Sequence, residues 1–253
     1  MDLALSGKVA LVTGGSRGLG EAVCRGLAAE GARVIVNYHR EQARAETLAA
    51  ALRDAGPGAA QAVQGDVSCG ADVVRLFDAG EAVWGSIDLL INSAGIWPQA
   101  MVKDLTEEAW DRTLAVNLKG VFLTCREAVR RWLAAGRGGR IVNVTSPAAF
   151  RGAATGHADY AASKGGVVSF TQSLAREVAG QGIYVNAVAP GMMQTDMARE
   201  ALERNLEDYL NRIPLRRIGE PEEVAAMIVF LASDRASYTT GATLDVSGGM
   251  LMR

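Results

Sequence analysis

The sequence predicts an α/β fold, doubly wound, with a mostly parallel sheet of seven strands and helices on both faces. Short runs of β-branched residues alternate with longer Ala-rich segments of helical period along the whole chain, and this order is typical of parallel strands joined by crossover helices. The runs Val9–Val12 and Asp88–Ile91 are nearly continuous in apolar residues, as expected where both faces of a sheet are covered. Because no linker or repeat divides the 253 residues, we expect a single domain over residues 1–253.

The expected elements follow one another in order along the chain. Strands are expected at Val9–Thr13, Arg33–Asn37, Ala62–Gly65, Ile87–Ile91, Arg140–Val144, Tyr184–Val188 and Thr243–Val246. Helices are expected at Leu19–Ala29, Glu41–Ala55, Ala71–Val83, Glu107–Ala135, Ala158–Ala179 and Glu222–Ala232. Pro221 suits the start of the last helix, because a proline lacks the N–H group that this position leaves unpaired.

Composition limits the partners and the location of the protein. Charged residues make up 21% of the chain, the net charge is −2, and no basic stripe is present, so we expect no nucleic acid partner. The longest apolar runs fall well short of the ~20 residues that span a bilayer, and no signal peptide is recognisable. Cys24, Cys69 and Cys125 lie far apart, which favours reduced thiols in the cytoplasm. His39 and His157 are too few and too separated for a metal site.

A glycine-rich turn, Thr13–Gly20, follows the first strand and reads TGGSRGLG. Gly14 allows a sharp turn, Gly18 lets the backbone approach a ligand, and Gly20 lets the next helix pack closely on the sheet. The N-terminus of that helix offers free N–H groups and the positive end of a dipole to a diphosphate. Because the turn lies between the first strand and the first helix, it indicates a Rossmann-type dinucleotide site.

Later segments add to this turn. Asn92-Ser93-Ala94-Gly95 follows the fourth strand, and Tyr160-Ala161-Ala162-Ser163-Lys164 lies in the helix after the fifth. Together with the glycine turn they resemble the short-chain dehydrogenase/reductase family, whose N-N-A-G and Y-x-x-x-K motifs they match apart from the serine at position 93. Residues 173–178, 214–225 and 240–249 are most similar to 3-oxoacyl-(acyl-carrier-protein) reductases. The resemblance implies an oxidoreductase that exchanges a hydride between a nicotinamide cofactor and a carbonyl compound.

The resemblance also implies which residues bind the cofactor. They are Gly14, Ser16, Arg17, Gly18, Leu19, Gly20, Asn37, Tyr38, His39, Arg40, Asp66, Val67, Asn92, Ala94, Gly95, Tyr160, Lys164, Pro190, Gly191 and Thr195. NAD-specific relatives usually place a carboxylate at the end of the second strand, but this chain has none before Glu41. Arg17 and Arg40 could supply the positive charge that a 2′-phosphate needs. We therefore expect NADPH/NADP⁺ rather than NADH.

Four residues are the expected catalytic group: Asn117, Ser146, Tyr160 and Lys164. Tyr160 and Lys164 are four residues apart and so share one face of a helix, where a nearby ammonium would lower the pKa of the phenol toward the range of a general acid. The resemblance implies that Lys164 holds the nicotinamide ribose and that Tyr160 protonates the carbonyl oxygen. It further implies that Ser146 hydrogen-bonds the same oxygen and that Asn117 holds a water linking Lys164 to solvent.

The substrate is the least determined feature. The pocket is expected at Trp97, Ser146, Phe150, Met192 and Met193, with a variable substrate segment at about residues 192–215. The expected reaction is the reversible reduction of a ketone to a secondary alcohol, with a 3-oxoacyl thioester as one candidate. The alternatives are a small free ketone, a diketone, a sugar or an alicyclic or aromatic alcohol. A different class, a non-catalytic NADP-sensing protein, is disfavoured because such proteins typically lose the tyrosine or the lysine.

Two further expectations concern partners. Arg130, Arg131, Arg137 and Arg140 could dock an acidic acyl carrier protein, although Gln181 stands where carrier-protein reductases often have a second docking arginine. The two long helices expected at Glu107–Ala135 and Ala158–Ala179 resemble those of four-helix interfaces in the family. The resemblance therefore implies a homotetramer.

Overall fold

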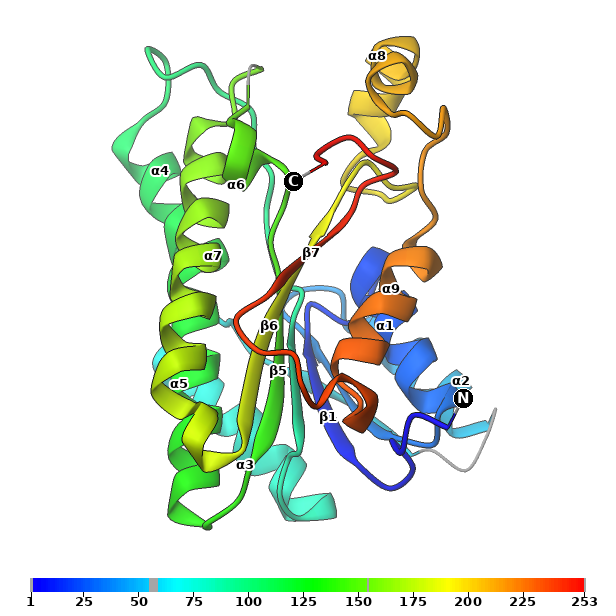
Figure 1. Ribbon diagram of the computed structural model, residues 1–253, viewed down its shortest axis with the longest axis vertical. Helices are drawn as coiled ribbons and strands as arrows, with labels where there is room; N and C mark the ends of the chain where they lie inside the picture. The colour runs from blue at the N-terminus through cyan, green and yellow to red at the C-terminus, as the bar shows by residue number, and fades with distance from the viewer. Residues whose placement is uncertain (1, 55–58, 154, 253) are drawn as a thin grey trace.

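Seven parallel strands form the centre of the computed structural model, which describes residues 2–54, 59–153 and 155–252. The strands are β1 (Val9–Thr13), β2 (Arg33–Tyr38), β3 (Ala60–Gln64), β4 (Leu89–Asn92), β5 (Gly139–Val144), β6 (Ile183–Pro190) and β7 (Thr243–Val246). They are ordered β3-β2-β1-β4-β5-β6-β7, and every neighbouring pair is parallel. The predicted doubly wound sheet is therefore confirmed, with each strand within about two residues of its expected bounds (Figure 1).

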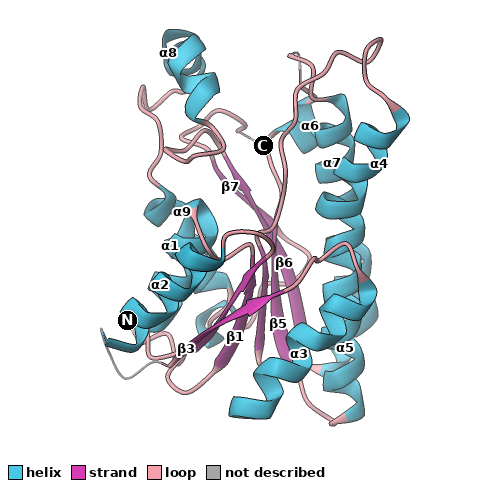
Figure 2. Ribbon diagram, turned by 180° about the vertical axis from the view of Figure 1, so that it is seen from behind, coloured by secondary structure: helices cyan, strands magenta, loops and turns pink. Residues whose placement is uncertain are grey.

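Helices cover the two faces of the sheet. They are α1 (Gly18–Ala29), α2 (Gln42–Asp54), α3 (Gly70–Trp84), α4 (Glu107–Leu114), α5 (Gly120–Ala134), α6 (Ala148–Arg151), α7 (Ala158–Val178), α8 (Arg199–Arg212) and α9 (Pro221–Leu231). One face carries α1, α2 and α9, and the other carries α3, α5 and α7 (Figure 2). No helix in the described ranges combines the length and the apolar character needed to cross a bilayer.

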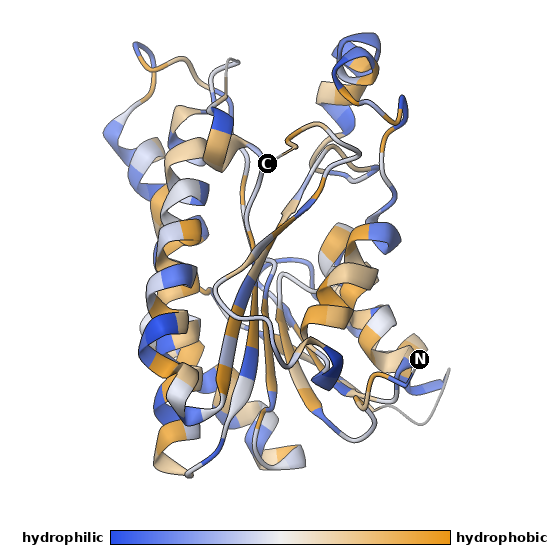
Figure 3. Cartoon of the chain, viewed as in Figure 1, coloured by the Kyte–Doolittle hydropathy of each residue, from blue (hydrophilic) through white to orange (hydrophobic). Residues whose placement is uncertain are grey.

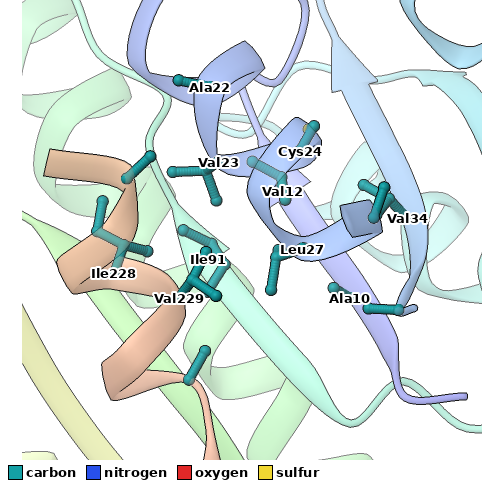
Figure 4. Packing of buried hydrophobic residues seen from close by; sticks show 14 of the residues in the cluster. Ala10, Val12, Ala22, Val23, Cys24, Leu27, Val34, Ile91, Ile228 and Val229 are labelled. Atoms are coloured by element: carbon teal, nitrogen blue, oxygen red, sulfur yellow. The ribbon is translucent and has the colours of Figure 1, made fainter. Parts of the chain in front are cut away.

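The alternation of side chains along each strand divides the core into two layers. Ala10 and Val12 of β1 belong to the cluster under α1 and α9, whereas Leu11 belongs to the cluster under α3 and α5, because successive strand residues point to opposite faces. Val23 and Leu27 of α1 pack above Val12 in the first layer (Figure 4). The strands are mostly apolar along their length, while the helices also carry polar residues (Figure 3). A sheet covered on both faces thus explains the continuous apolar runs in the sequence.

The helix prediction needs two corrections, and one of its bounds lies outside the described residues. The single helix expected at Glu107–Ala135 is divided into α4, a π-helical turn at Ala115–Lys119 and α5. Two helices, α6 and α8, were not predicted, because α6 has only four residues and α8 buries only Leu202, too little for an apolar stripe. The helix expected at Glu41–Ala55 is present as far as Asp54, and Ala55 lies outside the described residues.

Candidate active site

A cavity of about 610 Å³ opens at the carboxyl ends of the parallel strands. Its lining comes from the loops after the first six strands, β1 to β6, from the start of α7, and from α4, α6 and α8 around the mouth. Helices α4 and α6 lie across the mouth from α8 (Figure 1). In doubly wound sheets, ligands bind where the strand order reverses, which in this chain is the crevice between β1 and β4. The volume lies within the range of roughly 300–1,000 Å³ that is usual for ligand sites.

The glycine turn is closely packed and admits no side chain at two of its positions. A Cβ at Gly20 would lie 2.2 Å from the carbonyl oxygen of Gly14, and a Cβ at Gly14 would lie 2.8 Å from Cα of Ala94. Gly14 and Gly18 also have positive φ angles, of 63° and 54°. Helix α1 begins at Gly18 after Arg17, whose side chain makes no capping hydrogen bond. The first N–H groups of α1 therefore remain available at the cavity, and this cradle fits a dinucleotide diphosphate.

Asn37 fixes the turn from the end of β2. Its Oδ1 accepts a hydrogen bond from the Gly14 N–H at 3.2 Å, and its Nδ2 donates to the Gly65 carbonyl oxygen at 3.0 Å. The side chain therefore links the carboxyl ends of β1, β2 and β3. Asn37 lines the cavity, but its side-chain polar atoms bond the loops, so the side chain holds the glycine turn in place.

Charged side chains surround the end of the cavity next to β2 and β3. His39 lies 3.7 Å from the carboxylate of Asp66, and Arg17 lies 4.0 Å from Glu41. Arg40 is exposed, lines the cavity and forms no ion pair with any described residue. A guanidinium group without a carboxylate partner is suited to an anionic group of a ligand.

The three expected reactive side chains meet at the cavity. Ser146 follows β5, while Tyr160 and Lys164 come from the first two turns of α7. The Lys164 Nζ donates to the Val144 carbonyl oxygen at 2.8 Å and lies 5.7 Å from the centroid of the Tyr160 ring. The geometry thus brings a phenol, a hydroxyl and an ammonium to one wall of the cavity.

Burial, rather than the ammonium, dominates the titration of this pair. It raises the pKa of the Tyr160 phenol above its ordinary value, and an interaction with the Ser146 hydroxyl offsets only part of this. Burial also lowers the pKa of Lys164 to about 8. The pKa of the phenol is therefore shifted upward by burial, opposite to the lowering that was expected from Lys164.

Asn117 occupies the π-helical turn and is fully buried. Its Oδ1 accepts from the Ile96 N–H at 2.8 Å, and its Nδ2 donates to the Ile96 carbonyl oxygen at 2.9 Å and to Ser163 Oγ at 3.2 Å. The amide group therefore holds the loop after β4 against α7 and does not line the cavity. A water relay at Asn117 stays a prediction. Because the side-chain amide is already hydrogen-bonded, the water would have to bind the main chain of Asn117.

All but three of the predicted site residues line the cavity; the exceptions are Asn117, Asn92 and Phe150. Asn92 lies within β4, where it donates to Asn143 Oδ1 at 2.9 Å and accepts from Thr124 Oγ1 at 2.8 Å. These hydrogen bonds keep the Asn92 amide inside the sheet, so its expected cofactor contact is not supported by the geometry. Phe150 lies on α6 outside the cavity lining.

Several cavity residues were not predicted. His157 stacks on Trp97, and Arg112 and Arg151 come from α4 and α6 at the mouth. Arg212, on α8, lies within the substrate segment expected at about residues 192–215, but its place in the cavity lining was not singled out. No motif marks these positions, because they converge from α4, α6, α8 and the loop before α7. Within the described residues, no group of three or more His, Cys, Asp or Glu side chains could hold a metal ion.

Three of the four arginines expected to dock a carrier protein pair with carboxylates, whereas Arg130 forms no ion pair with any described residue. Arg131 contacts Asp78, Glu81 and Glu127. Arg137 contacts Asp88, and Arg140 contacts Asp234 at 3.1 Å. Arg137 and Arg140 lie at the amino end of β5, so the length of the strand, about 20 Å, separates them from the cavity. This geometry does not support docking at that cluster.

Comparison with known proteins places the chain in a family. Residues 14–251 match the family model described as enoyl-(acyl carrier protein) reductase. A 3-oxoacyl-(acyl-carrier-protein) reductase of Synechocystis is 44% identical over 250 residues, which cover 98% of this chain and 99% of that protein. The 3beta-hydroxysteroid dehydrogenase 1 of Eggerthella lenta is 43% identical over 258 residues, covering 98% and 95%. A crystal structure from Agrobacterium tumefaciens, provisionally assigned as a gluconate dehydrogenase, has a TM-score of 0.93 at 35% identity, covering 100% and 99%.

These matches extend over the glycine turn, the Tyr160–Lys164 motif and the carboxyl-terminal strand alike. They agree with the sheet order and with the position of the cavity. Proteins of this family use NAD(H) or NADP(H). The chain belongs to the short-chain dehydrogenase/reductase family and is an oxidoreductase that acts on CH–OH and C=O groups.

Proposed function

We propose that this protein reduces a ketone to a secondary alcohol with NADPH, using Tyr160 as the general acid. The observation that carries the proposal is the meeting of Tyr160, Ser146 and Lys164 in the cavity formed by the glycine turn. Tyr160 donates its proton to the carbonyl oxygen, and Ser146 hydrogen-bonds the same oxygen as negative charge develops on it. Lys164 holds the nicotinamide ribose from its fixed position at the Val144 carbonyl. The bound dinucleotide supplies the hydride.

The test of the reaction is the substitution Tyr160→Phe, which removes the phenol proton and little else. We expect NADPH to bind with nearly unchanged Kd and turnover to fall by about 10²–10⁴-fold, the usual contribution of a positioned acid. NADPH oxidation is followed by its absorbance, and Kd by fluorescence titration. Retention of more than a tenth of the wild-type kcat in the variant would contradict the role of Tyr160.

The preference for NADPH is supported by the charges near β2. Arg40 has no carboxylate partner among the described residues, and Glu41 is balanced by Arg17 at 4.0 Å and Arg44 at 3.7 Å. We expect kcat/KM with NADPH to exceed that with NADH. Arg40→Gln should lower the ratio of kcat/KM with NADPH to kcat/KM with NADH. The substitution removes a cation from the expected 2′-phosphate region and leaves Tyr160 unchanged. A wild-type preference for NADH would overturn the assignment.

Two substrate classes remain in competition, a free ketone and a 3-oxoacyl thioester on an acyl carrier protein. The second is favoured by the name of the Synechocystis relative, and the first by that of the Eggerthella lenta relative. If a carrier docks, the candidates for contact are Arg112, Arg151 and Arg212 at the cavity mouth. Turnover of carrier-bound and free 3-oxoacyl substrates, measured side by side, separates the two classes.

The assembly and the substrate segment are parts of the same proposal. We expect a homotetramer, which multi-angle light scattering would test directly. The segment at about residues 192–215 contributes Met192, Met193 and Met197 to the cavity together with α8, which supports its role as the substrate loop. Cytoplasmic location stays a prediction.

A further inference from the structure

An aromatic pair forms part of the cavity wall beside the catalytic tyrosine. The indole ring of Trp97 lies nearly parallel to the imidazole ring of His157, with 4.5 Å between the centroids and 23° between the planes. Both residues line the cavity. His157 is buried and precedes Tyr160 by three residues, at the N-cap of α7.

The two loops that carry the pair are joined by several hydrogen bonds. His157 Nδ1 lies 2.6 Å from the Pro98 carbonyl oxygen, and because a carbonyl oxygen only accepts, Nδ1 must carry the hydrogen. The Ala100 N–H donates to the Gly156 carbonyl oxygen at 2.8 Å, and Gln99 Nε2 donates to the Thr155 carbonyl oxygen at 2.7 Å. The Trp97 loop is therefore fixed to the start of α7 at three points.

The close approach of these loops depends on a glycine. Gly156 has a φ of 80°, and a Cβ there would lie 3.0 Å from the carbonyl carbon of Ala100. His157 thus contacts the Trp97 loop by a ring stack and by a hydrogen bond. The preceding residue, Gly156, lets the two backbones approach closely enough for this contact. A tryptophan held in this way presents one fixed surface, because its other face is covered by the imidazole ring.

The surface lies next to the reacting group. The centroids of Trp97 and Tyr160 are 6.3 Å apart, and their ring planes are inclined by 58°. Other parts of the cavity lining contain Met192, Met193 and Met250, whose unbranched thioether side chains adapt to different shapes. The pocket thus combines a rigid aromatic wall close to the phenol with an adaptable lining elsewhere.

We propose that His157 positions Trp97 as a specificity wall, and that this wall selects ketones with a planar or fused ring next to the carbonyl over linear acyl chains. The inference rests on the proposed ketone reduction at Tyr160 and concerns only which ketones are preferred. A flat ring placed against the indole gains aromatic contact in addition to the burial of its area. A linear chain gains no ring contact and also loses conformational freedom when it is ordered.

The test compares a bicyclic aryl ketone, α-tetralone, with a linear methyl ketone, 2-octanone, in the full-length protein with NADPH. Wild type should favour α-tetralone. Trp97→Ala should lower the ratio of the two kcat/KM values by about tenfold, through KM of α-tetralone rather than kcat, because Tyr160 is unchanged. Trp110→Ala is the matched control, since Trp110 lies on α4 outside the cavity lining, and it should leave the ratio unchanged.

Three substitutions at His157 separate positioning from mere folding. His157→Ala removes both contacts and should lower the ratio by at least about threefold. His157→Phe keeps the ring stack, and His157→Asn keeps an N–H donor for the Pro98 carbonyl, so each should restore part of the selectivity. Should Trp97→Ala fail to fold, Trp97→Leu replaces it, and the His157 series carries the same test.

The inference is overturned by a wild-type preference for 2-octanone, or by Trp97 and His157 variants that change both ketones by the same factor. An effect of Trp110→Ala equal to that of Trp97→Ala would also overturn it. These outcomes leave the proposed reduction intact. That reduction fails separately if the wild-type protein binds NADPH but turns over no carbonyl substrate.

Discussion

Lys164 should make the free energy of unfolding of this protein rise with pH above about pH 8, which is not expected of an ordinary surface lysine. Its side chain is 4% exposed, and its Nζ has one hydrogen-bond acceptor, the Val144 carbonyl oxygen. Burial of the ammonium lowers its pKa from 10.5 to about 8. The perturbation we consider is Lys164→Met, which keeps an unbranched side chain only one atom shorter and removes the charge.

The sign follows from the protons that each state binds. Below about pH 8 the lysine is charged in the folded and unfolded states, so the fold bears the full cost of the buried ammonium. Between about pH 8 and 10.5 the folded state releases its proton first, and stability rises with pH by about 1.4 kcal/mol per unit. Over this interval the wild type should gain about 3 kcal/mol from Lys164, and the methionine variant should not.

The assay is urea unfolding of both proteins at several pH values from 7 to 10.5. The free energy of unfolding of the variant minus that of the wild type should fall by about 3 kcal/mol across this range. The lost hydrogen bond to Val144 adds a constant to the difference and does not change its slope. A difference that stays flat within about 0.5 kcal/mol would refute a lowered pKa at Lys164.

Two further perturbations test the turn and the sheet. Gly20→Ala places a Cβ at 2.2 Å from the Gly14 carbonyl oxygen. The affinity for NADPH, measured by calorimetry, should therefore fall by at least about tenfold, and an unchanged Kd would show that the turn relaxes. Asn143→Ala leaves Asn92 and Thr171 without their shared hydrogen-bond partner. The free energy of unfolding, measured with urea, should fall by about 1–3 kcal/mol. A smaller loss would mean that water or a rearranged neighbour replaces the amide.

Much of the fold was predictable because the sequence signals are local. Parallel strands buried on both faces need continuous apolar runs, and crossover helices need a helical period, so both appear as short patterns in the chain. The glycine turn was predictable for the same reason, since Gly14 and Gly20 are required by contacts within one loop and its neighbour. The Tyr160–Lys164 pair was predicted from its resemblance to the family motif, and the spacing of a helix added only that the two side chains share a face.

The features that were missed depend on contacts between distant segments. Asn92 belongs to a matching motif, yet its amide is taken by Asn143 and Thr124, which are far away in the sequence. No motif marks His157, because its proposed role depends on a ring stack with Trp97, a residue on another loop. Helix α8 buries a single leucine, so its pattern could not be told from an exposed loop.

The protonation of Tyr160 and Lys164 bears on the direction of the proposed reaction. Burial moves the pKa of Tyr160 upward and that of Lys164 downward, so each group is drawn toward its neutral form. In the proposed mechanism, reduction begins from a protonated phenol, because Tyr160 gives a proton to the carbonyl oxygen, whereas alcohol oxidation begins from the phenolate acting as a base. A raised phenol pKa therefore favours the protonated phenol that reduction needs over the phenolate that oxidation needs. Below about pH 8 Lys164 still carries its charge, so the cation that we propose for the ribose and the proposed acid coexist in this range.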